Sequence, residues 1–380
     1  MKFKASFLPT LALATVSLEF SKPMAGRSTS FVKAEGQSFT LDGQPYCVFG
    51  SNSYWVGLTG LTTDEMDVVF KNIATTGALT RSPPLTGNYY QLWNGSTATI
   101  NYGSTGLGNF DNIVAAAKAN NIRLIVTLTN NWSDYGGMDV YVNQILGEGQ
   151  PHDYFYSNPE VIAAFQNYVR VWVERYVDEP TILGWELANE PRCTGSTSAT
   201  SGNCTTTTIT DWVKTMSTYI KSCDSNHLVG LGDEGWFNWS NSTDYTYDGS
   251  QGVDFDANLA IDTIDFGTFH LYPYSWGEET PSAMTWGQGW IEDHRSAQAT
   301  YNKPVLMEEF GVYADQNQTT TYENWYSTVI DCGLTGVLIW QAGSNLTSGP
   351  TPDDGFTIYP DTPVYYLGEQ YSTQLRAREL

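Results

Sequence analysis

The chain has 380 residues and a formal net charge of −23, because 41 Asp and Glu residues outnumber 18 Lys and Arg residues. Such an acidic chain repels phosphate backbones, which argues against a nucleic-acid partner, and it has no apolar run long enough to span a membrane. A hydrophobic content of 41% with 14% aromatic residues excludes a disordered chain. What is left is a globular protein whose aromatic rings either fill a core or meet a neutral ligand.

The first predicted element is a secretory leader. Lys2 and Lys4 precede an apolar stretch over residues 7–18, which is the pattern of a signal segment. Cleavage is expected after Ala14 or near Ala25, so we assign residues 1–25 to the leader and residues 26–380 to a single domain that acts outside the cell. Secretion agrees with the Asn-X-Ser/Thr sequons at Asn94, Asn131, Asn203, Asn238, Asn241, Asn317 and Asn345.

After the leader, short β-branched strands alternate with amphipathic helices. Thr63 is expected to cap the first helix, and Pro159 stands in the first turn of the third. In chain order the sequence predicts strand 46–50, helix 62–76, helix 109–120, strand 123–128, helix 158–177, strand 181–187, helix 209–223, strand 227–231, strand 264–270, helix 285–300, strand 304–308, helix 320–331, strand 336–340 and helix 362–375.

This alternation predicts an α/β protein. Runs such as RLIVTL at 123–128 are apolar on both faces, as parallel strands covered by helices require. An open doubly wound sheet and a closed (β/α)8 TIM barrel both fit that pattern. The strand count favours the barrel, and no Gly-X-Gly-X-X-Gly sequence follows the first strand, which argues against a dinucleotide-binding sheet.

Five cysteines leave at least one unpaired. Cys193 and Cys204 flank a segment rich in Ser, Thr and Gly, where a loop disulfide is plausible. Cys47, Cys223 and Cys332 cannot be paired from sequence. The chain has no Cys-X-X-Cys and no Cys/His cluster, so we expect neither a metal site nor a cofactor.

Polar and aromatic residues stand at the predicted carboxyl ends of the strands, where a TIM barrel builds its active site. Two strands bring carboxylates, and a pair of carboxyls beside Trp is what glycosidic cleavage needs: one protonated to donate, one ionised to attack. Because alternate residues of a strand face opposite sides, only one of Glu308 and Glu309 should face the cavity. The strand-end residues are Asn52, Trp55, Asn130, Asn131, Trp132, Asn189, Glu190, Arg192, Glu234, Trp236, His270, Tyr272, Glu308, Glu309 and Trp340.

Four of these segments resemble the signatures of glycoside hydrolase family five: LANEP at 187–191, HLYP at 270–273, EEFG at 308–311 and LIWQ at 338–341. NNWSDYGG at 130–137, NEPRC at 189–193 and DDGFTIYP at 353–360 are similar to segments of its secreted fungal endo-β-1,4-mannanases. The resemblance covers about residues 30–375 and implies a retaining hydrolase.

The resemblance also implies residue roles. Glu190 would be the acid/base and Glu309 the nucleophile. Asn189 would hold the sugar 2-hydroxyl in the −1 subsite, and His270 and Tyr272 would orient the two carboxyls. The resemblance also implies that Trp340 forms the platform under the −1 sugar and that Trp132 and Arg192 bind sugars in neighbouring subsites. The strand-end positions add three further cleft residues: Trp55, Trp236 and Glu234.

The stretch that corresponds to the second barrel strand departs from the family. Family members carry an Arg that bonds the nucleophile, followed by Trp-Gly-Phe. Here residues 77–86 contain Arg81 but no Trp-Gly-Phe, and Pro83 and Pro84 cannot donate to a central ladder. We hypothesise either an error in the gene sequence or a weakened enzyme; sequencing the transcript across this stretch decides, because a confirmed ALTRSPPLTG removes the first explanation.

The sequence therefore predicts a secreted, monomeric endo-β-1,4-mannanase that binds mannan, galactomannan or glucomannan and needs no cofactor. A β-1,4-glucanase (cellulase) of the same family is the nearest alternative, because mannose and glucose differ at one hydroxyl. A carbohydrate-binding barrel, catalytically weakened by its altered second strand, is the alternative from another class.

Overall fold

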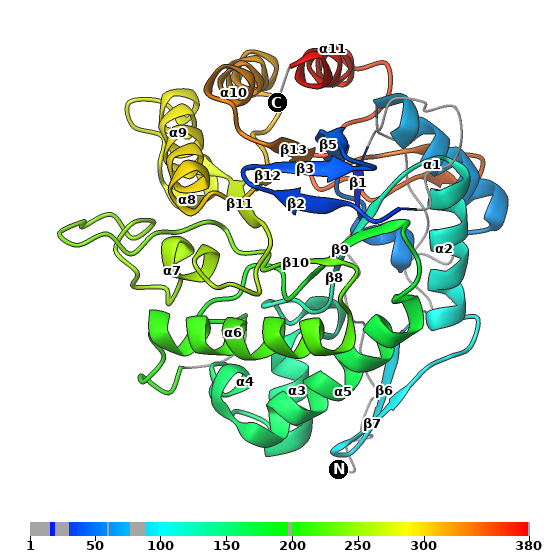
Figure 1. Cartoon of the computed structure of the whole chain (residues 1–380), viewed down its shortest axis with the longest axis vertical. Coiled ribbons are helices and arrows are strands. Elements are labelled where there is room, and N and C mark those ends of the chain that lie inside the picture. Colours follow the sequence, from blue (N-terminus) through cyan, green and yellow to red (C-terminus); the bar gives the residue numbers. More distant parts are fainter. Residues whose placement is uncertain (1–15, 20–29, 59–60, 77–88, 197–199, 379–380) are drawn as a thin grey trace, which may run out of the picture.

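The structure is a computed structural model that describes residues 16–19, 30–58, 61–76, 89–196 and 200–378. Seven parallel strands form the central sheet, and consecutive strands are linked by helices that surround it (Figure 1). The strands are β5 (Val48–Ser51), β8 (Leu124–Thr127), β9 (Ile182–Glu186), β10 (Leu228–Gly230), β11 (Gly267–Leu271), β12 (Val305–Phe310) and β13 (Gly336–Ile339).

The sheet closes on itself. Its hydrogen-bonded order is β10-β9-β8-β1-β5-β13-β12-β11, so β10 and β11 are the two ends. Backbone bonds join these ends: Asp265 N donates to Val229 O at 2.8 Å, and His270 N donates to Glu234 O at 3.2 Å. The predicted (β/α)8 TIM barrel and its single domain are thus confirmed.

The remaining barrel position, between β5 and β8, is taken by β1 (Val16–Glu19). β1 pairs antiparallel with both neighbours, whereas the other seven strands run parallel. The sequence places residues 77–86 in this position and assigns β1 to the leader. Residues 77–86, with Arg81, lie outside the described residues.

Seven long helices form the outer ring (Figure 1), and each overlaps a predicted one. They are α1 (Thr63–Thr76), α2 (Leu107–Ala119), α5 (Pro159–Tyr176), α6 (Thr206–Cys223), α9 (Ala283–Tyr301), α10 (Gln318–Cys332) and α11 (Pro363–Ala377). Within the described part of the chain, every helix is too short or too polar to cross a membrane.

The structure also contains short strands and helices that the sequence did not predict. The hairpins are β2 (Lys33–Glu35), β3 (Ser38–Leu41) and β4 (Gln44–Tyr46), then β6 (Gln91–Asn94) with β7 (Thr97–Ile100), and β14 (Asn345–Leu346) with β15 (Gly349–Pro350). The short helices are η1 (Tyr54–Gly57), η2 (Asp134–Gly136), α3 (Met138–Leu146), α4 (Tyr154–Ser157), α7 (Phe255–Leu259) and α8 (Pro273–Trp276).

An apolar floor closes the amino-terminal end of the barrel. Side chains from β2, β3 and β4 pack there against inward-facing residues of the barrel strands and form one buried cluster. Because this end is filled with hydrocarbon, polar groups inside the barrel gather towards the opposite, carboxyl end. The floor consists of Val32, Phe39, Leu41, Tyr46, Val48, Ile125, Leu183, Leu228, Phe266, Leu306 and Leu338.

Helix caps are set by local chemistry. Asn158 caps α5 by accepting hydrogen bonds from the N–H groups of Glu160 and Val161, and Pro159 follows it as predicted. The cap of α1 is Thr62, not Thr63 as predicted. Thr62 Oγ1 accepts from Glu65 N at 3.2 Å, and Glu65 Oε2 accepts from Thr62 N at 3.0 Å, which is a capping box.

We expect Thr62→Ala to lower the free energy of unfolding by about 1 kcal/mol, because it removes the cap acceptor. Thr63→Ala is the matched control one residue away and should change stability by less than about 0.5 kcal/mol. Chemical denaturation of both variants measures the difference. Equal losses would place the cap elsewhere.

Candidate active site

A cavity of about 560 Å³ opens at the carboxyl end of the barrel. Aromatic rings and carboxylates line it together, as expected for a site that binds a neutral, ring-shaped ligand and acts on it. Of the residues predicted from sequence, those that line it are Asn130, Trp132, Asn189, Glu190, Arg192, Tyr272, Glu309 and Trp340.

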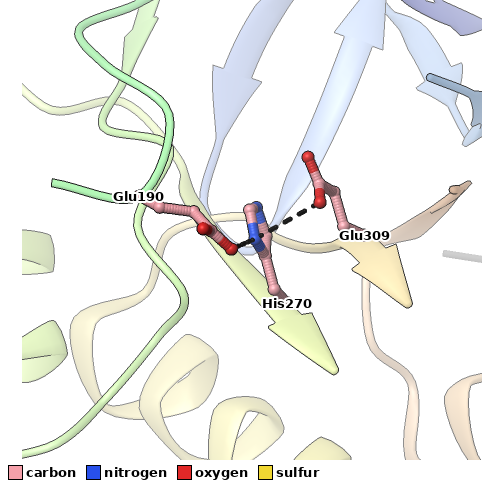
Figure 2. A group of neighbouring side chains, drawn as sticks. All are labelled: Glu190, His270 and Glu309. Atoms are coloured by element: carbon pink, nitrogen blue, oxygen red, sulfur yellow. Dashed lines mark hydrogen bonds and ion pairs between the residues drawn. The ribbon is translucent and has the colours of Figure 1, made fainter. Parts of the chain in front are cut away.

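Two carboxylates that line this cavity, Glu190 and Glu309, lie beside the imidazole of His270 (Figure 2). His270 Nδ1 lies 2.8 Å from Glu190 Oε1 and 3.5 Å from Glu309 Oε2. The hydroxyl of Tyr272 donates to Glu309 Oε2 at 2.9 Å, and the indole N–H of Trp132 donates to Glu190 Oε2 at 2.6 Å. His270 Nε2 is buried without a partner among the described residues. Each carboxylate is therefore fixed by its own donors, and His270 bridges the two.

Glu190 reaches the cavity from an unusual backbone conformation. It follows β9 with φ at +51°, a left-handed conformation that is unfavourable for a residue with a side chain. Backbone bonds hold the segment: Glu190 N donates to Gly232 O at 2.7 Å, and Asn189 N donates to Thr129 O at 2.9 Å. The strain is thus balanced by the strands on either side.

Glu309 and its neighbour Glu308 do not follow the simple alternation that the sequence predicted. Met307 pairs with Phe269, but the next pair along the two strands is Glu309 with His270, so β12 has one extra residue at Glu308. A bulge of this kind interrupts the alternation of side chains. Glu309 lines the cavity, and Glu308 points into the barrel below it, where its carboxyl interacts with Glu186. Only Glu309 faces the cavity, as predicted, but the bulge rather than regular alternation sets the directions of the two side chains.

The charges of the three central groups depend on one another. Burial acts to raise the pKa of Glu190, but the hydrogen bond and charge of His270 outweigh it and lower this pKa to about 2. Burial raises the pKa of Glu309 to about 8, against the charge of His270 and with help from the charge of Glu190. Burial opposes a charge on His270, but Glu309 and Glu190 raise its pKa to about 10. The cluster therefore holds one carboxyl proton at neutral pH.

Arg192 borders the cluster between two indoles. Its guanidinium lies 4.8 Å from the ring centre of Trp132 and 4.3 Å from that of Trp236, and its Nη2 is 3.9 Å from Glu190 Oε2. It also forms an ion pair with the fully buried Glu234. Burial raises the pKa of Glu234 to about 7 even though Arg192 acts to lower it.

Two more predicted residues complete the wall. Asn189 donates from Nδ2 to Asn130 Oδ1 at 3.1 Å and keeps its side chain at the cavity surface. Trp340 stacks parallel to Tyr54, with ring centres 5.7 Å apart, and its indole N–H donates to Asp354 at 2.7 Å. The indole is therefore held in place with its ring at the cavity.

Four predictions need correction. Glu234 is fully buried and does not line the cavity, so it is not a cleft residue. Trp55 is fully buried and bonds to Ala342 O, and Trp236 is 1% exposed, so neither indole can stack on a sugar ring. Trp236 instead supports Arg192. Asn131 is also fully buried and bonded, to Thr194 O among others, so this sequon cannot carry a glycan, whereas the other six are exposed. Tertiary packing decides whether a side chain is buried, and its position at the end of a strand does not predict this.

The disulfide between Cys193 and Cys204 is confirmed. It closes the loop directly after Arg192. Loop residue Thr194 accepts from the side chain of Asn131, and Ser196 accepts from Ser133 N. The disulfide loop is thereby tied to the segment that carries Trp132.

Sequence reasoning missed further lining residues, most of which lie in segments that follow the strands and not at the positions singled out as strand ends. Tyr54, which stacks on Trp340, also contacts Tyr135 with the two rings tilted, and Tyr135 has a positive φ of +59° inside the NNWSDYGG segment. That segment and DDGFTIYP were noted only for their resemblance, and they carry most of the missed residues. The missed residues with ionisable or large aromatic side chains are Tyr54, Asp134, Tyr135, Tyr245, Trp276, Asp354 and Phe356.

The same central residues offer ligand atoms to a cation. One atom each from Glu190, His270 and Glu309 lies within 4.8 Å of the others, and it is the sole such group found in the described part of the chain. Nδ1 of His270, however, already serves as the donor to the carboxylates. The geometry is that of a proton-sharing set, and a cation would have to displace that proton.

Comparisons with known proteins agree with this geometry. The profile of the family described as Cellulase (glycosyl hydrolase family 5) matches residues 32–346. The chain is 38% identical over 386 residues to a protein of Aspergillus flavus named probable mannan endo-1,4-beta-mannosidase A, which covers 95% of each chain. An endo-1,4-beta-mannanase structure from Rhizomucor miehei superposes with a TM-score of 0.83 at 40% identity, covering 92% of this chain and 100% of that one. A hyperthermostable endo-1,4-beta-D-mannanase from Thermotoga petrophila gives a TM-score of 0.75 at 35% identity, covering 86% and 99%.

The buried ion pair at the cavity wall makes a testable contribution to stability. We expect Glu234→Ala to lower the free energy of unfolding by about 2–3 kcal/mol, because Arg192 is left almost buried without its partner. Glu174→Ala breaks the exposed pair with Arg170 and is the control, with an expected change of about 0.5 kcal/mol or less. Thermal unfolding of both variants measures this, and equal losses would contradict it.

Proposed function

The chain belongs to glycosyl hydrolase family 5, and from that premise we propose that it is a retaining endo-β-1,4-mannanase. Glu190 acts as acid/base and Glu309 as nucleophile. The substrate is the backbone of mannan, galactomannan or glucomannan. Relatives of this chain are named for that activity.

The spacing of the two carboxylates is the observation that supports the retaining chemistry. An oxygen of Glu190 and one of Glu309 lie within 4.8 Å of each other. Retaining glycosidases place their carboxyls about 5–5.5 Å apart, whereas inverting enzymes need about 6.5–9.5 Å to fit a water molecule. With this spacing, Glu309 itself attacks the sugar.

In the first step Glu309 carboxylate attacks the anomeric carbon of the −1 sugar, and the bond to the leaving oxygen breaks. Glu190 gives its proton to that oxygen, so the shortened chain departs as an alcohol. A covalent ester between the sugar and Glu309 remains. In the second step the Glu190 carboxylate takes a proton from water, the hydroxyl attacks the anomeric carbon, and the ester bond breaks to release Glu309.

The ligand-free cluster holds the number of protons that this mechanism needs, but on the other carboxyl. Its pKa values put the proton on Glu309, and the reaction requires it on Glu190. A leaving oxygen that accepts a hydrogen bond from Glu190 favours the protonated acid there, and positive charge developing at the sugar favours ionised Glu309. Substrate binding therefore moves the proton from Glu309 to Glu190. His270 contacts both carboxyl groups and stays protonated, so the total charge of the cluster does not change.

The cavity wall suits a neutral polysaccharide. Trp132 and Trp340 present ring surfaces to it, and Asn189 and Arg192 supply hydrogen-bond donors beside the cluster. Asn189 Nδ2 is in place to bind a sugar hydroxyl next to Glu190. The hydroxyl of Tyr272 donates a hydrogen bond to Glu309. That hydrogen bond weakens as Glu309 loses its negative charge on forming the ester with the sugar.

We also propose that the protein is secreted as a monomer, after removal of residues 1–25. The disulfide and the six exposed sequons support secretion. Removal would take β1 with it, so the intact mass of the secreted chain tests the boundary; a mass that includes Val16–Glu19 would overturn it.

The function is tested by hydrolysis. We expect reducing ends to be released from galactomannan and not from carboxymethyl-cellulose, with oligosaccharides of several sizes appearing early. Cellulose-type activity alone would show the alternative that the family description names, a β-1,4-glucanase. Binding to mannan without products would show the carbohydrate-binding barrel.

The two catalytic roles predict different losses. Glu309→Gln should abolish turnover, because the amide cannot replace the carboxylate as nucleophile. Glu190→Ala should keep much of the rate of the first step on aryl mannosides with good leaving groups, because these leaving groups need no protonation. On mannan the same variant should lose about 10²–10⁴-fold in rate. Circular dichroism checks that both variants fold. Full activity in either would contradict the assignment.

The proton count predicts the pH dependence. The active form has one proton on the carboxyl pair; it is lost as the pH rises through about 8, and a second is gained as the pH falls towards about 2. The plot of kcat/KM against pH should therefore be bell-shaped, with its alkaline limb near 8. Constant activity well above that pH would contradict the shared proton.

A further inference from the structure

A second pair of carboxyl groups lies inside the barrel beneath the catalytic pair. Glu186 is the last residue of β9, and Glu308 lies on β12 next to the nucleophile. Both are buried, at 3% and 2% exposure, and neither lines the cavity. The mechanism above uses neither of them.

The two side chains meet across the interior of the barrel. β9 and β12 are not neighbours in the sheet, so contact between their side chains is possible only through the centre. The two carboxyl groups are close enough to shift each other's pKa, and the hydroxyls of Thr127 and Thr268 lie beside Glu186 and Glu308, respectively. Both carboxyl oxygens of Glu308 are buried without a hydrogen-bond donor among the described residues. Together these groups form a polar layer between the apolar floor and the catalytic cluster.

The described residues around this polar layer provide too few cationic side chains to neutralise two ionised carboxylates. Neither carboxyl has a Lys or Arg partner in the described part of the chain, and neither oxygen of Glu308 receives an N–H donor there. Two ionised carboxylates in contact in a buried site are strongly unfavourable. Burial and the charge of Glu308 raise the pKa of Glu186 well above its usual range. Burial also raises the pKa of Glu308, so the two carboxyl groups do not both ionise at neutral pH.

The remaining charge acts on His270. The ionisable groups around this imidazole are Glu190 after β9, Asp233 and Glu234 after β10, Tyr272 after β11, and Glu308 and Glu309 on β12. Of these, Glu308 lies on the neighbouring strand β12 and does not line the cavity, and its charge raises the pKa of His270. Because His270 Nε2 has no acceptor among the described residues, the imidazolium depends on the carboxylates around it.

We propose that Glu186 and Glu308 share one proton and serve as a positioning pair, whose single negative charge keeps His270 an imidazolium between the two catalytic carboxylates. During the reaction the charge of the catalytic pair changes, but the charge of the Glu186–Glu308 pair stays constant. Its kinetic consequences rest on the proposed function, whereas the shared proton itself does not.

Three variants separate charge from packing. Glu186→Gln and Glu308→Gln each keep one carboxylate and supply an amide donor to it, so we expect kcat/KM on mannan to fall by no more than about threefold. The double variant E186Q/E308Q keeps volume and hydrogen bonding but removes the charge. We expect its kcat/KM to fall about tenfold and its alkaline limb to move down by about one pH unit.

A measurement without substrate tests the same charge. The ¹⁵N signals of the His270 ring should show an imidazolium at pH 8 in wild type and in both single variants, and neutral imidazole in a larger share of the double variant. ¹³C signals of the glutamate carboxyls should show one acid and one carboxylate in the wild-type pair. Thermal unfolding verifies that each variant is folded.

The outcomes are distinct. A double variant with wild-type pH limits and wild-type ¹⁵N signals would reduce the pair to a packing element and overturn the proposal. Single variants as impaired as the double would also overturn it, because the charge would then not be what matters. If wild type fails to cleave mannan while the NMR signals behave as expected, the proposed function fails and the pair stands.

Discussion

At the carboxyl end of this barrel, buried carboxyl groups are stable only because they share a proton or lie beside a cationic side chain. Glu190 and Glu309 can lie close together in a low-dielectric cavity only because His270 bridges them and because the pair retains one proton. Arg192 is stabilised in the same way, by Glu234 behind it and indoles on both sides. The hydrogen bonds that hold these side chains are therefore also what sets their charges.

The barrel supplies that arrangement through its backbone. The apolar floor fills one end and confines polar groups to the other. A left-handed residue at Glu190 and a bulge at Glu308 then turn side chains that regular strands would direct elsewhere. The bulge has a second effect, since it places two consecutive glutamates inside the barrel, one for the sugar and one for the layer beneath. The proposed nucleophile and one of the two carboxyl groups proposed to support it thus come from one irregularity of β12.

Much of this could be predicted from the sequence. The alternating pattern located the main strands and helices, and the strand ends together with the resemblance led to Glu190 and Glu309. The bulge could not be predicted, because period-two alternation has no signal for one extra residue. Trp55 and Trp236 were misplaced because a strand end does not reveal which indole the loops bury. The antiparallel β1 could not be foreseen either, since its pairing depends on which segment occupies one position in the sheet.

The central claim is that Glu309 forms a covalent bond with the sugar while Glu190 moves the proton. Incubation with a 2-deoxy-2-fluoro-β-mannosyl fluoride, which slows the second step, should trap the intermediate. Mass spectrometry of the digested protein should then find one sugar, attached to Glu309. A label on Glu308 or Glu190, or product of inverted configuration with no trapped sugar, would contradict the account.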